Sequence, residues 1–315
     1  MKTLKVATAQ FEPRDGDKAY NLSVIEKLTA RACEKGAEMV AFHECSVTAY
    51  TFLNDLTSDE IHDLAESVPD GPTTRHLISL AQKYDTALLA GLVEKRDGKL
   101  YNTYICVDKT GLLARFSKLH PFISPYLSAG NHYEVFDYKG WTCGILICYD
   151  NNVIENVRAT TLLGAEVIFA PHVTCCTPSS MPGRGYVPDA LWQNRYTDPV
   201  PLRTEFDGPK GRDWLMRWLP SRAYDNGVYY VYANPIGYDG SHLKNGNSMI
   251  LDPYGNIVTE IRSFENDICV ATLTADKLTL AGGYRYRNAR RPELYRDILG
   301  KEHTAETHPV WLDKK

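Results

Sequence analysis

Three residues of this 315-residue chain could together carry out nucleophilic chemistry: a glutamate, Glu44, a lysine, Lys118, and a cysteine, Cys148. A cysteine that attacks carbon needs a base, which takes its proton and later returns it to a leaving group. It also needs a cation or N–H donors that stabilise the developing oxyanion. Glu44 and Lys118 supply one candidate for each role, so the set favours covalent catalysis through Cys148.

Cys148 is predicted to lie at a corner between a buried strand and a helix. It directly follows the apolar run 144–147, and apolar residues recur at helical spacing from Val153 onward. The N–H groups and the positive dipole end of a helix favour a thiolate over a thiol, and the same N–H groups can hold an oxyanion. We therefore expect an ionised thiol at this corner.

Glu44 and Lys118 come at the ends of two further strand-like segments, 37–42 and 112–118. Ligands of open α/β sheets bind at the carboxyl ends of strands, where these side chains would project. Taken singly, each residue also has a structural interpretation: Glu44 as a solvated loop residue, Lys118 as a surface residue and Cys148 as a core thiol. The functional interpretation depends on all three occurring at the same kind of position.

The composition argues against several classes of function. A net charge of −4 gives no electrostatic reason to expect nucleic acid or an anionic membrane as a partner. The N-terminus lacks a signal-peptide pattern, and no window reaches the roughly 18 consecutive apolar residues of a spanning helix. The eight cysteines include no CxxC pair and no zinc spacing, so we expect no metal site, reduced thiols and a cytoplasmic location.

Strands and helices alternate along the chain, which predicts one α/β domain with a mixed sheet or two stacked sheets. The expected strands are 4–11, 37–42, 86–94, 100–108, 112–118, 144–147, 165–171, 228–234, 247–251 and 267–273. The expected helices are 21–35, 73–84, one that follows Cys148, and 214–226. The stretch 172–212, rich in Pro, Gly, Thr and Arg, is expected to be irregular, and its length indicates a function or a contact.

These residues occur in segments that resemble the nitrilase superfamily of carbon–nitrogen hydrolases. The resemblance runs from about Leu4 to Tyr295, with Glu, Lys and Cys in the family's order. The matching segments are VATAQF (6–11), FHECSVTAY (42–50), FSKLHPF (116–122), GILICYDNN (144–152), PSRAYDNGVYYVYAN (220–234), DPYGNIV (252–258) and RRPELY (290–295).

The resemblance implies a four-layer αββα sandwich with mixed sheets, as a single domain over 1–298, and a C-terminal tail, 299–315, that contacts another subunit. It also implies a Glu–Lys–Cys triad, in which Cys148 forms a thioester or thioimidate and Glu44 is the general base and acid. Lys118 and the backbone N–H of Tyr149 would stabilise the oxyanion. No metal or organic cofactor is implied, and the expected assembly is a homodimer or a higher homo-oligomer.

The chain departs from the family pattern in one place. Many members have a second glutamate after the lysine, which helps to place the lysine and the substrate. The corresponding segment here, 119–130, contains no carboxylate. Either another group such as His120 or Tyr126 fills that role, or the chemistry is altered.

The sequence Cys-Tyr-Asp at 148–150 resembles amide-hydrolysing branches of the family more than the Cys-Trp-Glu of nitrile-hydrolysing branches. A small linear carboxamide is therefore the favoured substrate. Hydrolysis of N-carbamoyl amines or nitriles, acyl transfer from the same thioester, and a catalytically silent binding protein remain alternatives.

The remaining candidate residues concern the pocket and its support. His172, Thr174 and Cys175 follow the strand 165–171 and are candidate substrate contacts. The arginines of the following stretch could bind a substrate carboxylate bidentately, or could belong to an ordered surface loop: Arg184, Arg195, Arg203 and Arg212. Glu155 and Arg158 are expected to form an ion pair along the helix after Cys148.

Overall fold

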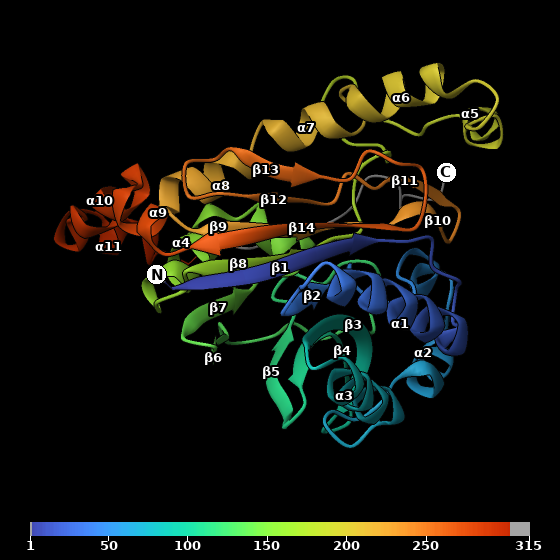
Figure 1. Cartoon of the computed structure of the whole chain (residues 1–315), viewed down its shortest axis with the longest axis horizontal. Coiled ribbons are helices and arrows are strands. Elements are labelled where there is room, and N and C mark those ends of the chain that lie inside the picture. The colour runs from blue at the N-terminus through green and yellow to red at the C-terminus, as the bar shows by residue number, and fades with distance from the viewer. Residues whose placement is uncertain (1, 303–315) are drawn as a thin grey trace.

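Two six-stranded mixed sheets stack face to face between layers of helices in the computed structural model, which describes residues 2–302 (Figure 1). The first sheet has the spatial order β14 (Asp267–Thr274), β1 (Thr3–Gln10), β2 (Met39–Ala41), β3 (Ala87–Arg96), β4 (Lys99–Asp108) and β5 (Gly111–Ser117). The second has the order β13 (Ile257–Glu260), β12 (Met249–Leu251), β9 (Tyr229–Ala233), β8 (Val167–Pro171), β7 (Trp141–Ile145) and β6 (Val135–Tyr138). A hairpin of β10 (Ile236–Asp239) and β11 (His242–Asn245) stands apart from both sheets.

Helices flank both sheets, and the last three in residues 2–302 lie at one end of the sandwich (Figure 1). The helices are α1 (Lys18–Glu34), α2 (Ser58–Leu64), α3 (Pro72–Tyr84), α4 (Ile154–Leu162), α5 (Asp189–Gln193), α6 (Pro199–Asp207), α7 (Arg212–Met216), α8 (Leu219–Asn226), α9 (Asp276–Leu280), α10 (Gly282–Asn288) and α11 (Pro292–Leu299). Helices α1 and α3 pack on the first sheet, and α4 and α8 pack on the second. The result is the predicted four-layer αββα sandwich. None of the helices in residues 2–302 is both long and apolar enough to cross a membrane.

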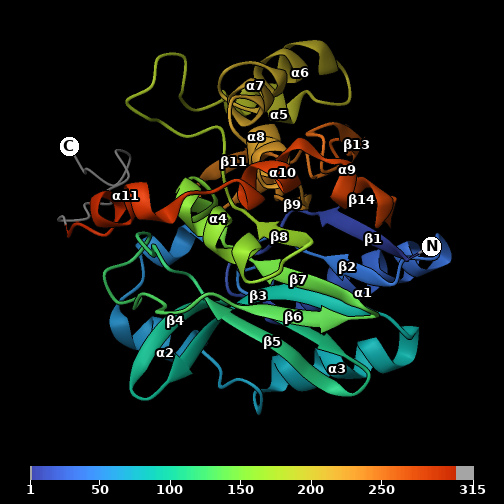
Figure 2. The same ribbon diagram turned by 90° about the vertical axis from the view of Figure 1, so that its left-hand side faces the viewer.

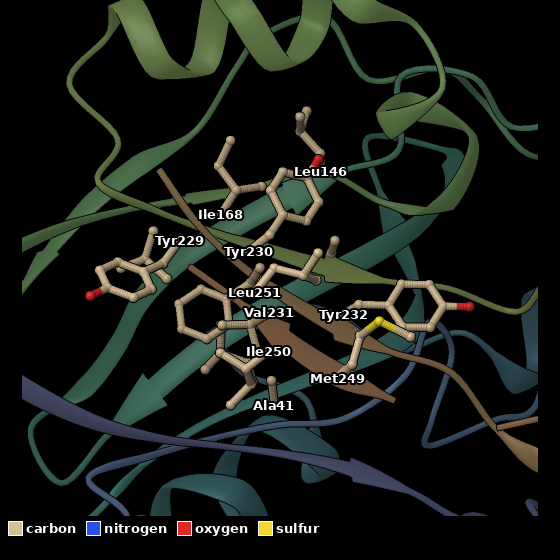
Figure 3. Packing of buried hydrophobic residues seen from close by; sticks show 14 of the residues in the cluster. Ala41, Leu146, Ile168, Tyr229, Tyr230, Val231, Tyr232, Met249, Ile250 and Leu251 are labelled. Carbon is tan, nitrogen blue, oxygen red and sulfur yellow. The ribbon is translucent and has the colours of Figure 1, made fainter. Parts of the chain in front are cut away.

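Alternating side chains divide each strand of the first sheet between two apolar layers. In β1, Leu4 and Val6 belong to the core between the sheets, whereas Ala7 and Ala9 belong to the layer under α1 and α3. This alternation follows from the two-residue period of a strand. Because both faces are covered, most residues of β1, β3 and β4 are buried whichever face they occupy. Figure 3 shows part of the larger apolar cluster, with labelled side chains of β8, β9 and β12 and with Ala41 of β2 at its lower edge.

Most predicted strands agree with the structure to within a few residues, but the prediction of an irregular stretch over 172–212 is wrong. It contains α5 and α6, which lie with α7 outside the second sheet (Figure 2). The helix predicted over 214–226 is two helices, because Pro220 lies in the first turn of α8, where a missing N–H is tolerated, and would break a longer helix. Helices α2, α10 and α11 and the β10–β11 hairpin were not expected. Of the predicted tail, residues 303–315 lie outside the described residues.

The loop that carries Glu44 follows β2 and lies directly on β3. The main-chain N–H of Gly91 donates to Ser46 Oγ at 3.1 Å. A Cβ atom on Gly91 would come within 2.3 Å of the main-chain nitrogen of Cys45. Only glycine therefore permits this close approach, which sets the position of Glu44.

Candidate active site

Glu44, Lys118 and Cys148 come together between the two sheets, although 104 residues separate the first from the last (148 − 44 = 104). Glu44 follows β2, Lys118 follows β5, and Cys148 follows β7 in the opposite sheet. Lys118 Nζ donates to Glu44 Oε1 at 2.7 Å, and both side chains are completely buried. Cys148 keeps 7% of its surface exposed. The expected constellation of base, cation and thiol is therefore present as a geometric unit.

The two oxygens of the Glu44 carboxylate have different surroundings. Oε1 accepts hydrogen bonds from Lys118 Nζ and from Asn102 Nδ2, the latter at 2.6 Å. Oε2 is buried without a hydrogen-bond partner in the described structure, apart from a contact between the carboxylate and the Cys148 thiol. A carboxylate fixed through one oxygen leaves the other free to accept a proton, as a general base must.

Lys118 lies in a mixed polar and aromatic cage. Its Nζ is 3.4 Å from Tyr50 Oη and 5.1 and 4.9 Å from the ring centres of Tyr50 and Phe122, within the range of cation–π interactions. Burial alone lowers the pKa of Lys118, but the Glu44 carboxylate opposes this effect, and the net pKa lies well above its usual value. Lys118 is therefore a fixed positive charge beside Cys148.

Cys148 stands on a strained turn between β7 and α4. It begins the 3-10 turn η2 (Cys148–Asn151) with φ of 47°, in the left-handed region that non-glycine residues rarely adopt. Burial and the charge of Glu44 raise the thiol pKa to about 12, against the lowering effects of Lys118 and the main-chain N–H of Val173. The expectation of a resting thiolate is therefore wrong. A neutral thiol faces an acceptor carboxylate, because desolvation outweighs the local N–H groups.

Replacement of Glu44 by glutamine is expected to lower the thiol pKa, because the Glu44 charge raises it. The alkylation rate of Cys148 by iodoacetamide, followed by mass spectrometry of its peptide, should rise at lower pH in this variant than in the wild type. The matched control is Glu38→Gln, which removes a carboxylate paired with Lys139 at the surface. Identical pH profiles for wild type and Glu44→Gln would contradict the assigned cause.

Asp150 links the turn that carries Cys148 to the segment that carries Lys118. Its buried carboxylate accepts hydrogen bonds from the main-chain N–H groups of Leu119 and His120 at 3.1 and 3.0 Å. It also contacts His120 Nδ1 at 2.8 Å and the main-chain N–H of Ile147 at 3.3 Å. A carboxylate that holds the residues after Lys118 is thus supplied by the nucleophile turn and not by the segment 119–130.

Replacement of Asp150 by asparagine is expected to reduce kcat by about 100-fold with a smaller effect on KM, because a misplaced Lys118 is costly even at small displacements. An amide cannot accept from all of these donors, since one of its two heads is itself a donor. Steady-state kinetics and thermal denaturation measure the two effects. Asp137→Asn, which alters a carboxylate bonded to Thr142 on β7, is the control. Equal kinetics for Asp150→Asn and Asp137→Asn would refute the positioning role.

Three other residues predicted for the site are Tyr149, His120 and Tyr126. Tyr149 follows Cys148 in the turn, and its ring packs edge-on against Phe122 at 5.6 Å. His120 is tied to Asp150 through Nδ1. Tyr126 is 45% exposed and takes no part in the hydrogen bonds of Glu44 or Lys118 described above. Among the described residues, therefore, neither His120 nor Tyr126 forms a hydrogen bond with Lys118 in place of the absent glutamate.

Two of the predicted substrate contacts, His172 and Thr174, directly follow β8. His172 is completely buried and contacts the rings of Trp218 and Tyr232. Its Nδ1–H donates to Ala170 O, and its Nε2 has no hydrogen-bond partner in the described structure. Burial lowers the pKa of His172 to about 3, so its ring is neutral. Thr174 is fixed by its main-chain N–H to Asn234 Oδ1 at 2.9 Å.

Cys175 and its neighbour Cys176 are both buried, and both have positive φ, at 70° and 53°. This backbone turns the chain from β8 toward the stretch that contains α5 and α6. Cys175 remains a free thiol.

The predicted ion pair between Glu155 and Arg158 is wrong. Arg158 donates instead to the main-chain carbonyl of Asp225 at 2.9 Å. The nucleophile turn is held by Arg222, which donates to the carbonyls of Asn151 and Asn152 at 2.8 and 3.0 Å. Arg222 belongs to the neighbouring helix α8, so residue spacing within α4 could not predict this contact.

Asn102, Asp150 and Tyr50 complete the site and were not predicted from the sequence. Asn102 could have been predicted, because it is a polar residue within strand β4, and a buried amide must find hydrogen-bond partners. Asp150 and Tyr50 could not have been predicted, because their partners come from distant segments. Within residues 2–302 no group of three or more His, Cys, Asp or Glu side chains is placed to hold a metal ion.

Comparison with known proteins adds independent information. A family model described as carbon-nitrogen hydrolase matches residues 5–282. A nitrilase of Pyrococcus abyssi is 28% identical over 273 residues, which are 86% of this chain and 89% of that protein. An (R)-stereoselective amidase of a Pseudomonas species is 28% identical over 261 residues, which are 82% of this chain and 80% of that protein.

Among solved structures, a variant of the Nesterenkonia AN1 amidase, from the nitrilase superfamily, superposes with a TM-score of 0.68. The two sequences are 23% identical, and the match covers 93% of this chain and 97% of that chain. The similarity confirms the sandwich architecture.

Proposed function

The chain belongs to the carbon–nitrogen hydrolase family and acts on carbon–nitrogen bonds other than peptide bonds, and from this premise we propose that it hydrolyses a small linear carboxamide. The products are a carboxylate and ammonia, and the intermediate is a thioester on Cys148. No cofactor takes part in these steps.

In the proposed reaction Cys148 Sγ attacks the amide carbon while Glu44 Oε2 takes the thiol proton. The Lys118 ammonium and the backbone N–H of Tyr149 stabilise the tetrahedral oxyanion. Glu44 returns the proton to the departing ammonia, which leaves the acyl group on Cys148. Glu44 then takes a proton from water as the water oxygen attacks the thioester carbon. The C–S bond breaks, Glu44 returns that proton to the Cys148 thiolate, and the product acid loses its own proton to solvent to become the carboxylate.

The observation that carries this proposal is the unequal use of the Glu44 oxygens. Oε1 is held by Lys118 and Asn102, and Oε2 has no partner but the neighbouring thiol. With the thiol pKa raised to about 12, the cysteine needs such a base to react at neutral pH. Tyr149 and Asp150 after the cysteine favour an amide over a nitrile as substrate.

An ammonia-release screen over linear carboxamides, N-carbamoyl amino acids and nitriles tests the substrate class. The expected result is the highest kcat/KM for a carboxamide. A higher kcat/KM for an N-carbamoyl compound or a nitrile would show that the proposed substrate class is wrong and would identify the correct one. Hydroxylamine added as an acceptor measures the competing acyl transfer, since a hydroxamate then forms in place of the carboxylate.

We also propose that the chain forms a homodimer through the surface around α4 and α11. Apolar side chains of both helices are exposed there, and they are Ile154, Leu162, Leu294, Ile298 and Leu299. A cavity of about 530 Å³ lies between these helices, α8 and α10. Light scattering on the purified chain tests the proposal, which a monomer at micromolar concentration would contradict.

A further inference from the structure

A second buried lysine, Lys244 on β11, lies near Cys148 and has no place in the reaction described above. It is 2% exposed, and its one hydrogen bond in the described structure is a long one, 3.5 Å from Nζ to Cys175 O. The Cys148, Cys175 and Cys176 side chains are all near enough to influence the pKa of Lys244, so its ammonium belongs to the surroundings of the nucleophile.

Lys244 lacks a carboxylate within ion-pairing distance among residues 2–302. The nearest acidic influence is Asp239, whose carboxylate already accepts hydrogen bonds from the main-chain N–H groups of Tyr50 and Thr51. Burial lowers the pKa of Lys244 and Asp239 raises it again only in part. A buried ammonium with one weak hydrogen bond is costly unless an anion compensates it.

Two further side chains around Cys175, Tyr232 and Arg184, have donors that are not fully used. Tyr232 Oη is completely buried and has no hydrogen-bond partner besides the Cys175 thiol. In Figure 3 the Tyr232 hydroxyl points away from the aliphatic side chains of the core. Arg184 donates through Nη1 to the carbonyls of Pro209 and Lys210, at 3.2 and 2.9 Å, while its Nε is buried and unpaired.

Arg184 and Tyr232 both contact the Cys175 side chain, and Lys244 acts on the same thiol by its charge. Two cations and a hydroxyl donor therefore lie around Cys175, and among residues 2–302 neither cation has a carboxylate within ion-pairing distance. This donor set is the complement of a carboxylate, which offers two oxygens for charge-assisted hydrogen bonds.

We propose that Lys244, with Tyr232 and Arg184, binds a carboxylate of the substrate, so that the enzyme prefers a carboxamide that carries a second, acidic end. The substrate class is then the monoamide of a dicarboxylic acid. This inference rests on the proposed function for the reacting amide, and it adds which end of the substrate is recognised and by what.

Binding to a Cys148→Ala protein tests the inference without any turnover. Calorimetric titrations compare the monoamides of malonic, succinic, glutaric and adipic acids with neutral aliphatic amides of matched length. We expect at least one acidic monoamide to bind about 100-fold more tightly than its neutral counterpart, since a site built from buried polar groups rejects an analogue that leaves them unpaired. Equal affinity throughout the series, including no measurable binding, overturns the inference.

The residue is tested by Lys244→Met and Lys244→Arg in the same Cys148→Ala background. The methionine variant is expected to lose the preference for the acidic monoamide, and the arginine variant to keep most of it. Lys109→Met, which removes a surface lysine paired with Asp85, is the matched control and should keep the full preference. A preference that survives in Lys244→Met overturns the inference.

Two further measurements distinguish carboxylate binding by Lys244 from a structural role of this residue and from amide turnover. Thermal denaturation of Lys244→Met should give a stability equal to or above that of the parent protein, because an uncompensated buried charge is removed. A large loss of stability, with affinities for acidic and neutral amides reduced equally, would assign Lys244 a structural role. Wild-type protein that binds the acidic monoamide without releasing ammonia would refute the proposed function and leave the carboxylate site standing.

Discussion

Replacement of Cys148 by alanine is expected to abolish ammonia release, with a fall in kcat of about 10,000-fold or more, because no other group can form the thioester. The folded structure should persist. The side chain is small and keeps part of its surface exposed, so the loss of stability should be about 1 kcal/mol. Ammonia release and thermal denaturation of the same preparation measure both quantities.

A second cysteine provides the control for this variant. Cys269 is buried on β14 and is a free thiol. Cys269→Ala should lose a similar amount of stability and retain its turnover. Substantial amide hydrolysis by Cys148→Ala would contradict the assignment of Cys148 as the nucleophile. Loss of hydrolysis in Cys269→Ala alone would contradict it as well.

Replacement of Lys118 by methionine is expected to damage both activity and stability. The Glu44 carboxylate is completely buried and would lose its positive partner, which costs about 3–5 kcal/mol for a buried pair broken on one side. The oxyanion would lose its cation, and kcat should fall by about 1,000-fold. Denaturant unfolding measures the free energy of unfolding, and steady-state kinetics measure the loss of turnover.

The double variant Glu44→Gln/Lys118→Met distinguishes the structural from the chemical effect of this pair. Removal of both charges should restore much of the stability lost in Lys118→Met, because no uncompensated charge remains. Activity should stay as low as in either single variant, since residues that act as a unit are not additive. Lys139→Met, which breaks a surface pair with Glu38, should change stability by only about 0–1 kcal/mol. Recovery of activity in the double variant would contradict the proposed roles.

Much of the fold could be predicted because the relevant pattern is local. The alternation of Leu4, Val6, Ala7 and Ala9 and the end of α3 at Tyr84 depend on neighbours within a few residues. Helices α5 and α6 were missed because proline and glycine flank them, which also favours a loop. Tertiary packing decides the matter, because Trp192 of α5 and Phe206 of α6 both contact the ring of Phe264, between β13 and β14.

The sequence by itself determined the types and the strand-end positions of Glu44, Lys118 and Cys148, because an apolar strand and the residue that ends it are adjacent in the chain. Only the tertiary structure decided how these groups behave. The thiol is neutral because burial and the charge of Glu44, which comes from the opposite sheet, raise its pKa. The unpaired cation Lys244 likewise comes from a hairpin nearly a hundred residues further along the chain (244 − 148 = 96). Electrostatic effects depend on distance in space and on exclusion of water, and neither can be read from adjacency in the sequence.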